Sequence, residues 1–419
     1  MHMKNIAAIV LAAGKGTRMR SETPKVLHKI LGKPIIRHIV DSVKEAGITD
    51  IVTVAGFGSS LLKNAVNDTK VAVQKRLLGS ADAVVTAKKA IGKNVHDILI
   101  ICGDTPLIKG KTIKALIEKH KSSKASLTLL TAKLKDPRPY GRVVRGSDGK
   151  ILKIVEETEA SLYEEVINEI NVGTYCFSAK DLYEALSEIK PDNKKKEFFL
   201  TDTIGILRGK GKIIESVSAE DPDEAIGVNT RKDLAQATTI LKENILETLM
   251  SGGVTIEDPP STTIYQDVRI GKDTVIHPNT VIESDVVIGA GCHIGPFARI
   301  RPGVHIGDRV EIGNFVELVR THVEDGAKIK HHTYLGDALI GKDVNVGAGT
   351  ITANFDGKTK NRTVIEERAS IGVGAILIAP VRIGRGAVVG AGCVVPKNHN
   401  VPKDATVVGV PARLLKKNK

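Results

Sequence analysis

The stretch IRPGVHIGDRVEIGNFVELV, Ile300–Val319, places an aliphatic residue at every sixth position. A helix repeats near every 3.6 residues and a strand every second residue, so neither element explains a period of six. A fixed short repeat with glycine beside the aliphatic residue is typical of a β-solenoid. We therefore expect residues 263–419 to form a parallel β-helix, in which each hexad is one side of a triangular coil.

The same period extends along most of the second half of the chain. At three hexads per coil it predicts roughly eight coils. The repeat breaks at the polar segment Thr352–Thr363, and an extruded loop of this kind often carries function. Glycine often follows the aliphatic residue, and we expect it at corners that need a positive φ. The aliphatic positions are Ile270, Ile276, Ile282, Ile288, Ile294, Ile300, Ile306, Ile312 and Leu318, then Ile365, Ile371, Leu377, Ile383, Val389, Val395, Val401 and Val407; the glycines are 271, 289, 295, 307, 313, 341, 347, 372, 384 and 390.

Residues 1–229 show a different rhythm, in which short apolar runs alternate with amphipathic ones. This βαβα order predicts a Rossmann-like α/β domain with a mostly parallel sheet that is covered by helices on both faces. Ligands then bind at the carboxyl ends of the strands. Residues 230–262 are expected to be a linker with a helix over Arg231–Met250. The expected strands are Ile6–Ala13, Asp50–Ala55, Val71–Gln74 and Asp97–Asp104.

The overall composition narrows the possible functions. The 419 residues carry a net charge of +13, which raises the possibility of nucleic-acid binding. The basic residues are scattered, however, and their densest run is Lys194–Lys196, without a recognition helix, zinc finger or aromatic platform. We therefore expect either a solvated basic surface or anionic small substrates, and no nucleic acid. No apolar run is long enough to span a bilayer, and four widely separated cysteines indicate a reducing, cytoplasmic location.

The loop LAAGKGTRMRSETPK, Leu11–Lys25, follows the first expected strand. Its small residues let the backbone approach a phosphate chain, and its basic residues supply charge. It is neither a Walker A loop nor a dinucleotide fingerprint, because Ile9 and Met19 occupy required glycine positions. A plain tight turn remains an alternative. Asp104 ends a later strand, where a lone carboxylate suits Mg²⁺ bound to substrate phosphates.

The full loop resembles the sugar-1-phosphate nucleotidyltransferase signature L-A-A-G-x-G-T-R-M followed by P-K. PYGRV, IVEE, EINVGTY and GVNTR then follow in that family's order. Nearly the whole chain resembles the bifunctional N-acetylglucosamine-1-phosphate uridylyltransferase/glucosamine-1-phosphate acetyltransferases. The resemblance implies that acetyl-CoA acetylates glucosamine-1-phosphate, and that UTP then converts N-acetylglucosamine-1-phosphate to UDP-N-acetylglucosamine with release of pyrophosphate.

For the first half, the resemblance implies that Lys25 and Arg18 neutralise phosphate charge while Asp104 and Asn229 bind Mg²⁺. Two positions depart from the family pattern, since Leu77 replaces a glutamine and Cys102 a tyrosine, which makes base selection less secure than the chemistry. The implied nucleotide and sugar contacts are Leu11, Ala13, Gly14, Gln74, Gly79, Ser80, Gly141, Glu156 and Asn171.

For the second half, the string Lys328–Lys360 resembles the acetyltransferase motifs, which implies that His331 is the general base. The family's acetyl-transfer sites lie between neighbouring left-handed solenoids, so a homotrimer is implied. Val319, Val373 and Gly409 replace a lysine, a serine and an arginine, and are expected to weaken acetyl transfer. A monofunctional nucleotidyltransferase, or a scaffold β-helix that binds another protein, therefore stays open. The implied sugar-phosphate contacts are Arg301, Tyr334, Asn345 and Lys360, and the implied acetyl-CoA contacts are Ala348, Asn354, Phe355 and Ala391.

Overall fold

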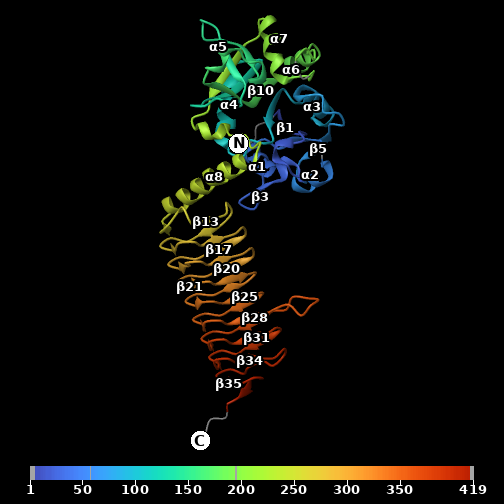
Figure 1. Ribbon diagram of the computed structural model, residues 1–419. Coiled ribbons are helices and arrows are strands. Elements are labelled where there is room, and N and C mark those ends of the chain that lie inside the picture. The colour runs from blue at the N-terminus through green and yellow to red at the C-terminus, as the bar shows by residue number, and fades with distance from the viewer. Residues whose placement is uncertain (1–4, 57, 194–195, 416–419) are drawn as a thin grey trace. The chain divides into compact units, whose positions relative to one another are not determined.

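The computed structural model describes residues 5–56, 58–193 and 196–415, so Lys194 and Lys195 of the basic run lie outside it. The chain divides into two compact units, residues 1–238 and 239–419 (Figure 1). In the described residues, no helix is long and apolar enough to cross a membrane.

The first unit is built on one mixed sheet that has nine strands among the described residues. Its central part is parallel, as expected, with β1 between β4 and β6 and with β5 beside β4. β1 lies in the middle because its residues from Ala7 to Val10 are fully apolar and buried. These four strands are β1 (Ile6–Ala12), β4 (Asp50–Ala55), β5 (Lys70–Val73) and β6 (Asp97–Cys102).

Helices connect these parallel strands. In α1 the residues Ile35, Ile36, Ile39, Val40 and Val43 form one buried face, as the amphipathic pattern of the sequence predicts. The alternation of strand and helix predicted for this half is therefore confirmed. The helices are α1 (Ile35–Glu45), α2 (Ser59–Ala65), α3 (Ser80–Ala87) and α4 (Gly110–Ser123), and a small β2 (Lys29–Ile30) and β3 (Lys33–Pro34) hairpin precedes α1.

The rest of the sheet is largely antiparallel. β10 lies antiparallel between β6 and β7, and β8 pairs with both β9 and β10. Because β10 runs opposite to β6, its first residues lie beside the carboxyl end of β6, at the edge where ligands are expected. The elements are β7 (Leu127–Lys133), β8 (Arg142–Arg145), β9 (Ile151–Val155), β10 (Glu169–Ser178), β11 (Ile214–Ser218), α5 (Leu162–Glu165), α6 (Ala179–Leu186) and α7 (Thr203–Gly209).

The long helix α8 (Arg231–Ser251) contains the boundary between the two units. It begins after Thr230, whose hydroxyl accepts a hydrogen bond from the Asp233 amide at 3.2 Å while Asp233 Oδ2 accepts from the Thr230 amide at 2.8 Å. This reciprocal pair satisfies two free amides at the helix start. The helix matches the predicted one to within a residue.

The second unit is a parallel β-helix with three faces, in which each strand pairs with the strand of the next coil. Eight described strands form the second face, in agreement with the predicted coil number. The first face holds β12 (Thr255–Ile256), β15 (Val275–Ile276), β18 (His293–Ile294), β21 (Glu311–Asn314), β24 (Lys328–His331), β27 (Asn345–Val346), β30 (Ser370–Ile371), β33 (Val388–Val389), β35 (Thr406–Val408) and the antiparallel β36 (Arg413–Leu414). The second holds β13 (Thr263–Ile264), β16 (Val281–Ile282), β19 (Arg299–Ile300), β22 (Glu317–Val319), β25 (Tyr334–Gly336), β28 (Ile351–Ala353), β31 (Ile376–Ile378) and β34 (Val394–Val395). The third holds β14 (Arg269–Ile270), β17 (Val286–Ile288), β20 (Val304–Ile306), β23 (His322–Val323), β26 (Ala338–Ile340), β29 (Thr363–Ile365) and β32 (Val381–Ile383).

The repeated aliphatic side chains form the core, as predicted. All of them are buried except Ile270, which is partly exposed near the start of the β-helix. The break in the period has two causes. Ile300 pairs with Leu318, but Leu318 pairs with Leu335, so a coil loses one residue there. Residues 354–362 of the polar segment Thr352–Thr363 then form a protruding loop between β28 and β29 (Figure 1).

The prediction for the repeated glycines was wrong in its physical reason. Of the ten glycines, only Gly295 has a positive φ. Eight of the other nine are required by close stacking, since a Cβ on Gly313 would lie 1.9 Å from the Lys330 carbonyl oxygen and one on Gly372 would lie 2.4 Å from the Ala391 nitrogen, while Gly390 has slightly more room at 3.0 Å. The left-handed conformation falls elsewhere in the corners, for example at Asp273, Gly291 and Arg309.

Candidate active sites

Four predicted phosphate and metal residues meet at the carboxyl edge of the parallel strands. Lys25 Nζ lies 2.5 Å from Asp104 Oδ2 and donates to Asn229 Oδ1 at 2.9 Å. Arg18 Nη2 donates to the same Asn229 oxygen at 3.0 Å. One carboxylate oxygen and one amide oxygen therefore converge on a single cation.

Backbone structure explains why residues so far apart in sequence meet here. Lys25 lies in the loop after β1, and Asp104 follows the adjacent parallel strand β6. The Val228 amide donates to the Asp104 carbonyl at 2.7 Å, which places Asn229 beside Asp104. The Asn229 amide is in turn held by Asp233 Oδ2 at 2.9 Å.

The donor set suits Mg²⁺ because Asp104 and Asn229 present two hard oxygens to one point. Mg²⁺ usually binds one or two protein ligands together with waters and substrate phosphates. A transition-metal cluster is a poorer match, since no group of three or more His, Cys, Asp or Glu residues arranged for a metal occurs among the described residues. Lys25 currently supplies the positive charge between these two oxygens.

Six of the predicted nucleotide-contact residues line one cavity of about 550 Å³: Leu11, Ala13, Gly14, Gln74, Gly79 and Ser80. Gln74 is buried, and its Nε2 donates to Asp82 Oδ2 at 2.7 Å and to the Gly79 carbonyl at 3.2 Å. These two bonds fix the orientation of the Gln74 amide. Its Oε1 accepts no hydrogen bond from the described residues and can therefore accept one from a nucleotide base. Leu77 lines the same cavity, in place of the expected glutamine.

The three predicted sugar residues also come together. The Asn171 amide donates to the Gly141 carbonyl at 2.9 Å, and a Cβ on Gly141 would lie 3.6 Å from Glu156 Oε2. The Asn171 side chain is positioned by its Nδ2, which donates to the Tyr175 hydroxyl at 2.7 Å. Thr201, which sequence reasoning missed, donates its hydroxyl to Glu156 Oε1 at 3.3 Å.

A second missed residue, Tyr140, joins the sugar end to the metal end. Its hydroxyl accepts a hydrogen bond from the Gly227 amide at 3.1 Å, within the segment that holds Asn229. The motif PYGRV contains this tyrosine, so the sequence carried a signal for it. Cys102 is the last residue of β6, at the same edge of the sheet. Burial raises the pKa of its thiol to about 12, and the negative charge of Asp104 contributes less strongly. The thiol stays neutral and is unsuited to nucleophilic attack.

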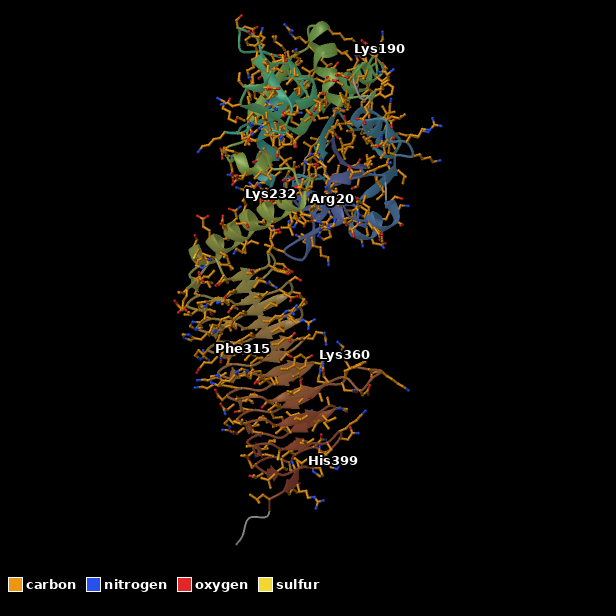
Figure 2. All side chains as sticks on the ribbon, in the orientation of Figure 1. Arg20, Lys190, Lys232, Phe315, Lys360 and His399 are labelled. Carbon is orange, nitrogen blue, oxygen red and sulfur yellow. The ribbon has the colours of Figure 1, made fainter. Side chains whose placement is uncertain are left out.

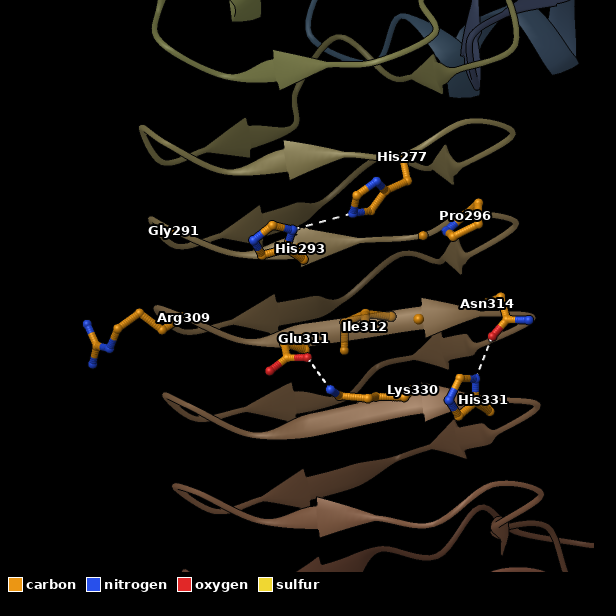
Figure 3. A pocket seen from close by; sticks show the side chains of 12 residues that line it. His277, Gly291, His293, Pro296, Arg309, Glu311, Ile312, Asn314, Lys330 and His331 are labelled. Atoms are coloured by element: carbon orange, nitrogen blue, oxygen red, sulfur yellow. Dashed lines mark hydrogen bonds and ion pairs between the residues drawn. The ribbon is translucent and has the colours of Figure 1, made fainter.

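In the second unit, His331 ends β24 on the first face of the β-helix (Figure 3). Its Nδ1 lies 2.7 Å from Asn314 Oδ1, one coil earlier. The asparagine oxygen only accepts, so Nδ1 carries a proton, and Nε2 is the ring nitrogen that can accept one from a substrate. Both residues line a groove of about 600 Å³ along the first face. Lys330 and Glu311 line the same groove and form an ion pair at 2.5 Å.

Other predicted acetyltransferase residues lie on the second face and its loop. Arg301 Nη1 pairs with Glu317 Oε1 at 2.9 Å, and Glu317 pairs in register with Tyr334. The Tyr334 hydroxyl and Asn354 Nδ2 both approach Gly336, since each lies 2.6 Å from where a Cβ would be. Lys360 lies on the protruding loop (Figure 2), where its backbone forms an isolated antiparallel β-bridge with that of Phe355.

The remaining predicted residues lie on neighbouring coils. Gly349, which follows Ala348, donates its amide to the His331 carbonyl at 3.2 Å, so Ala348 lies near the proposed base. Asn345 begins β27 on the first face, while Ala391 stacks on Gly372. The structure therefore divides the predicted set between two faces that share a corner, rather than gathering it in one cavity.

The two units match two family models. The nucleotidyl transferase model matches residues 7–221, and the bacterial transferase hexapeptide model matches residues 267–302, 285–320 and 362–397. Fold and sites thus define a nucleotidyltransferase joined to a left-handed hexapeptide-repeat transferase.

Curated relatives show similarity over nearly the whole chain. "Bifunctional protein GlmU" of Geobacillus sp. strain WCH70 is 43% identical, with 98% of this chain and 96% of the relative covered. The proteins of the same name from Shouchella clausii and Heliobacterium modesticaldum are 41% and 39% identical, covering 98% and 100% of this chain and 98% of each relative. The chain belongs to the GlmU family of bifunctional proteins. The expectation of a combined uridylyltransferase and acetyltransferase is confirmed at the level of the family.

Proposed function

We propose that the β-helix transfers an acetyl group from acetyl-CoA to glucosamine-1-phosphate, and that the first unit then joins N-acetylglucosamine-1-phosphate to the uridylyl group of UTP. The observation that carries this proposal is the presence of two separate sites of different chemistry. One gathers Lys25, Asp104 and Asn229, and the other holds the Asn314–His331 pair. For the functional limits we keep residues 1–229, a linker 230–262 and residues 263–419.

In uridylyl transfer, a phosphate oxygen of the sugar attacks the α-phosphorus of UTP and pyrophosphate leaves. The attacking oxygen is already anionic, so no protein base is required. Lys25 and Arg18 stabilise the charge that develops on the phosphates, while the Gln74 cavity holds the base and Gly141, Glu156 and Asn171 hold the sugar. When bound by Asp104 and Asn229, Mg²⁺ supplies further charge neutralisation.

In acetyl transfer, the sugar amine attacks the thioester carbonyl, a C–N bond forms and the C–S bond breaks. His331 Nε2 accepts the proton of the amine, and coenzyme A leaves as the thiolate and takes up a proton. The Asn314 oxygen supports this role because it accepts from Nδ1–H and stabilises the imidazolium that forms. No nucleophilic cysteine is required.

We further propose that the acetyltransferase site forms between copies of the chain in a homotrimer. His331 and Tyr334 lie on either side of the corner between the first and second faces, and a neighbouring copy packed against this corner would enclose a substrate there. Exposed aromatic rings at the same corner support this arrangement: Phe297 stacks on Phe315 at 5.2 Å between ring centroids, and Phe315 on His332 at 5.0 Å. About half of each phenylalanine is exposed in the single chain, which is costly unless another surface covers it.

The proposed location is the cytoplasm. All four cysteines are free thiols, as expected in a reducing compartment, and three of them are buried. The proposed ligands are the sugar phosphates, UTP, Mg²⁺ and acetyl-CoA, with no nucleic acid. The test is to supply purified protein with each substrate set and to follow pyrophosphate release and thiol release separately; absence of either product would remove that half of the proposal.

A further inference from the structure

Three successive coils each place a polar side chain at the corner between the second and third faces. Arg320 follows β22, Asp337 follows β25 and Asn354 follows β28. Arg320 donates Nε and Nη2 to the two oxygens of Asp337 at 2.6 and 2.8 Å, and Asn354 Nδ2 donates to Asp337 Oδ2 at 2.5 Å. The Asp337 carboxylate thus holds the Arg320 guanidinium in one orientation through two parallel hydrogen bonds.

This network leaves positive charge and hydrogen-bond donors available. Arg320 Nη1 forms no hydrogen bond with the described residues, and 41% of the side chain is exposed. Lys360, on the loop that begins at this corner, has no ion pair within the described ranges. Its charge reaches Asp337, whose pKa is lowered mainly by the hydrogen bond from Arg320 and further by Asn354 and Lys360. Two cations therefore surround one carboxylate, which leaves a net positive corner.

The neighbouring side chains show which ligand fits. Tyr334 places its hydroxyl beside Gly336, next to the same network, and Asn354 closes it from the following coil. Val319 lies beside Arg320 but is apolar and only 3% exposed, so it offers no charge. A phosphate monoester matches a held guanidinium with a second cation nearby, because the remaining N–H groups of the arginine are already oriented.

We propose that Arg320, positioned by Asp337, is a further cation for the phosphate of the amino-sugar substrate, and that it acts beside Lys360, which the family resemblance already implies as a phosphate contact. This inference rests on the proposed acetyl transfer, and it identifies the cation that acts where Val319 offers none. The competing interpretation is that the Arg320–Asp337 pair only joins two coils. Arg382 and Glu366 form such a pair at 2.5 Å on the third face and provide a matched control.

Chemical protection tests the subsite without relying on turnover. The full chain is treated with phenylglyoxal, and modification of each arginine is followed by peptide mass spectrometry. Glucosamine-1-phosphate should slow modification of Arg320 severalfold, while glucosamine should not, and Arg382 should react equally in all samples. Equal rates at Arg320 with and without the sugar phosphate would overturn the subsite. Absence of acetyl transfer in a protein that still shows protection would instead refute the proposed activity.

Kinetics distinguish phosphate binding from a structural role. Arg320→Ala should lower kcat/KM for glucosamine-1-phosphate by about 10- to 150-fold, the range expected for one charge-assisted contact. It should leave kcat/KM for glucosamine and KM for acetyl-CoA unchanged. Arg320→Lys, which retains a cation for Asp337, should fall between Arg320→Ala and wild type, and Asp337→Asn should raise KM for glucosamine-1-phosphate alone. Equal losses on both sugars would show that the pair is only structural.

Discussion

The hydrogen bond between His331 and Asn314 allows a quantitative test of the acetyltransferase mechanism. Removing the acceptor with Asn314→Ala leaves His331 in place but no longer fixes Nδ1 as the protonated nitrogen. A hydrogen bond to a charged group contributes about 1.5–3 kcal/mol, or about 10- to 150-fold in rate. His331 is exposed, so water replaces part of the lost bond, and we expect a decrease in kcat near tenfold. His331→Ala, which removes the base itself, should cost about 10²- to 10⁴-fold.

The assay follows thiol release from acetyl-CoA with glucosamine-1-phosphate, and pyrophosphate release in the same preparation is the internal control. His305→Ala is the matched control because it removes an exposed imidazole from the third face, away from Asn314. Asn314→Asp retains an acceptor but adds negative charge beside the ring. It should therefore shift the acid limb of the pH–rate profile to higher pH. Wild-type thiol release from Asn314→Ala would refute the orienting role of Asn314, and wild-type release from His331→Ala would refute the assignment of the base.

Four further predictions follow from the same structure. Asp104→Ala should abolish uridylyl transfer because Mg²⁺ loses its carboxylate ligand, and full activity in excess EDTA would contradict the metal assignment. Gly313→Ala should lower the denaturation midpoint far more than Gly390→Ala, because the added Cβ meets the Lys330 carbonyl at 1.9 Å rather than a Val408 methyl at 3.0 Å; equal midpoints would contradict the stacking argument. Asp337 has a lowered pKa, so its ionised form stabilises the β-helix above about pH 4 and this contribution is lost as the pH falls further; Asp337→Asn should reduce the acid sensitivity of urea unfolding between pH 6 and 3, and an unchanged pH dependence would argue against it. Light scattering should give three times the 44.8 kDa chain mass, and a monomer at micromolar concentration would exclude a site shared between copies.

Much of the fold was predictable because its elements are local in sequence. The sixfold period specifies which side chains enter the β-helix core, and short apolar runs specify the parallel strands around β1. The antiparallel insertion of β10 between β6 and β7 was not predictable, since strand order depends on contacts between distant segments. The glycine positions were correct but their cause was not, because the distance between stacked coils cannot be derived from one hexad.

In the candidate sites, too, residues within local motifs were predictable and residues that depend on contacts between coils were not. Lys25, Asp104 and the residues of the nucleotide cavity lie in motifs that follow strands, so their convergence was expected. Asn314 and Asp337 were missed because each contacts a residue one coil away, and that register depends on the coil losing one residue. The position of Arg320 depends on the same corner, and only the structure shows that its guanidinium reaches Asp337.

The assignment of two separate active sites is tested most directly by comparing both half-reactions in three proteins: wild type, Asp104→Ala and His331→Ala. Pyrophosphate release is measured with UTP, Mg²⁺ and N-acetylglucosamine-1-phosphate, and thiol release is measured with acetyl-CoA and glucosamine-1-phosphate. Wild type should perform both reactions, Asp104→Ala should lose only the first and His331→Ala should lose only the second. A wild-type chain without thiol release, or a single substitution that removes both activities from a folded protein, would contradict this assignment.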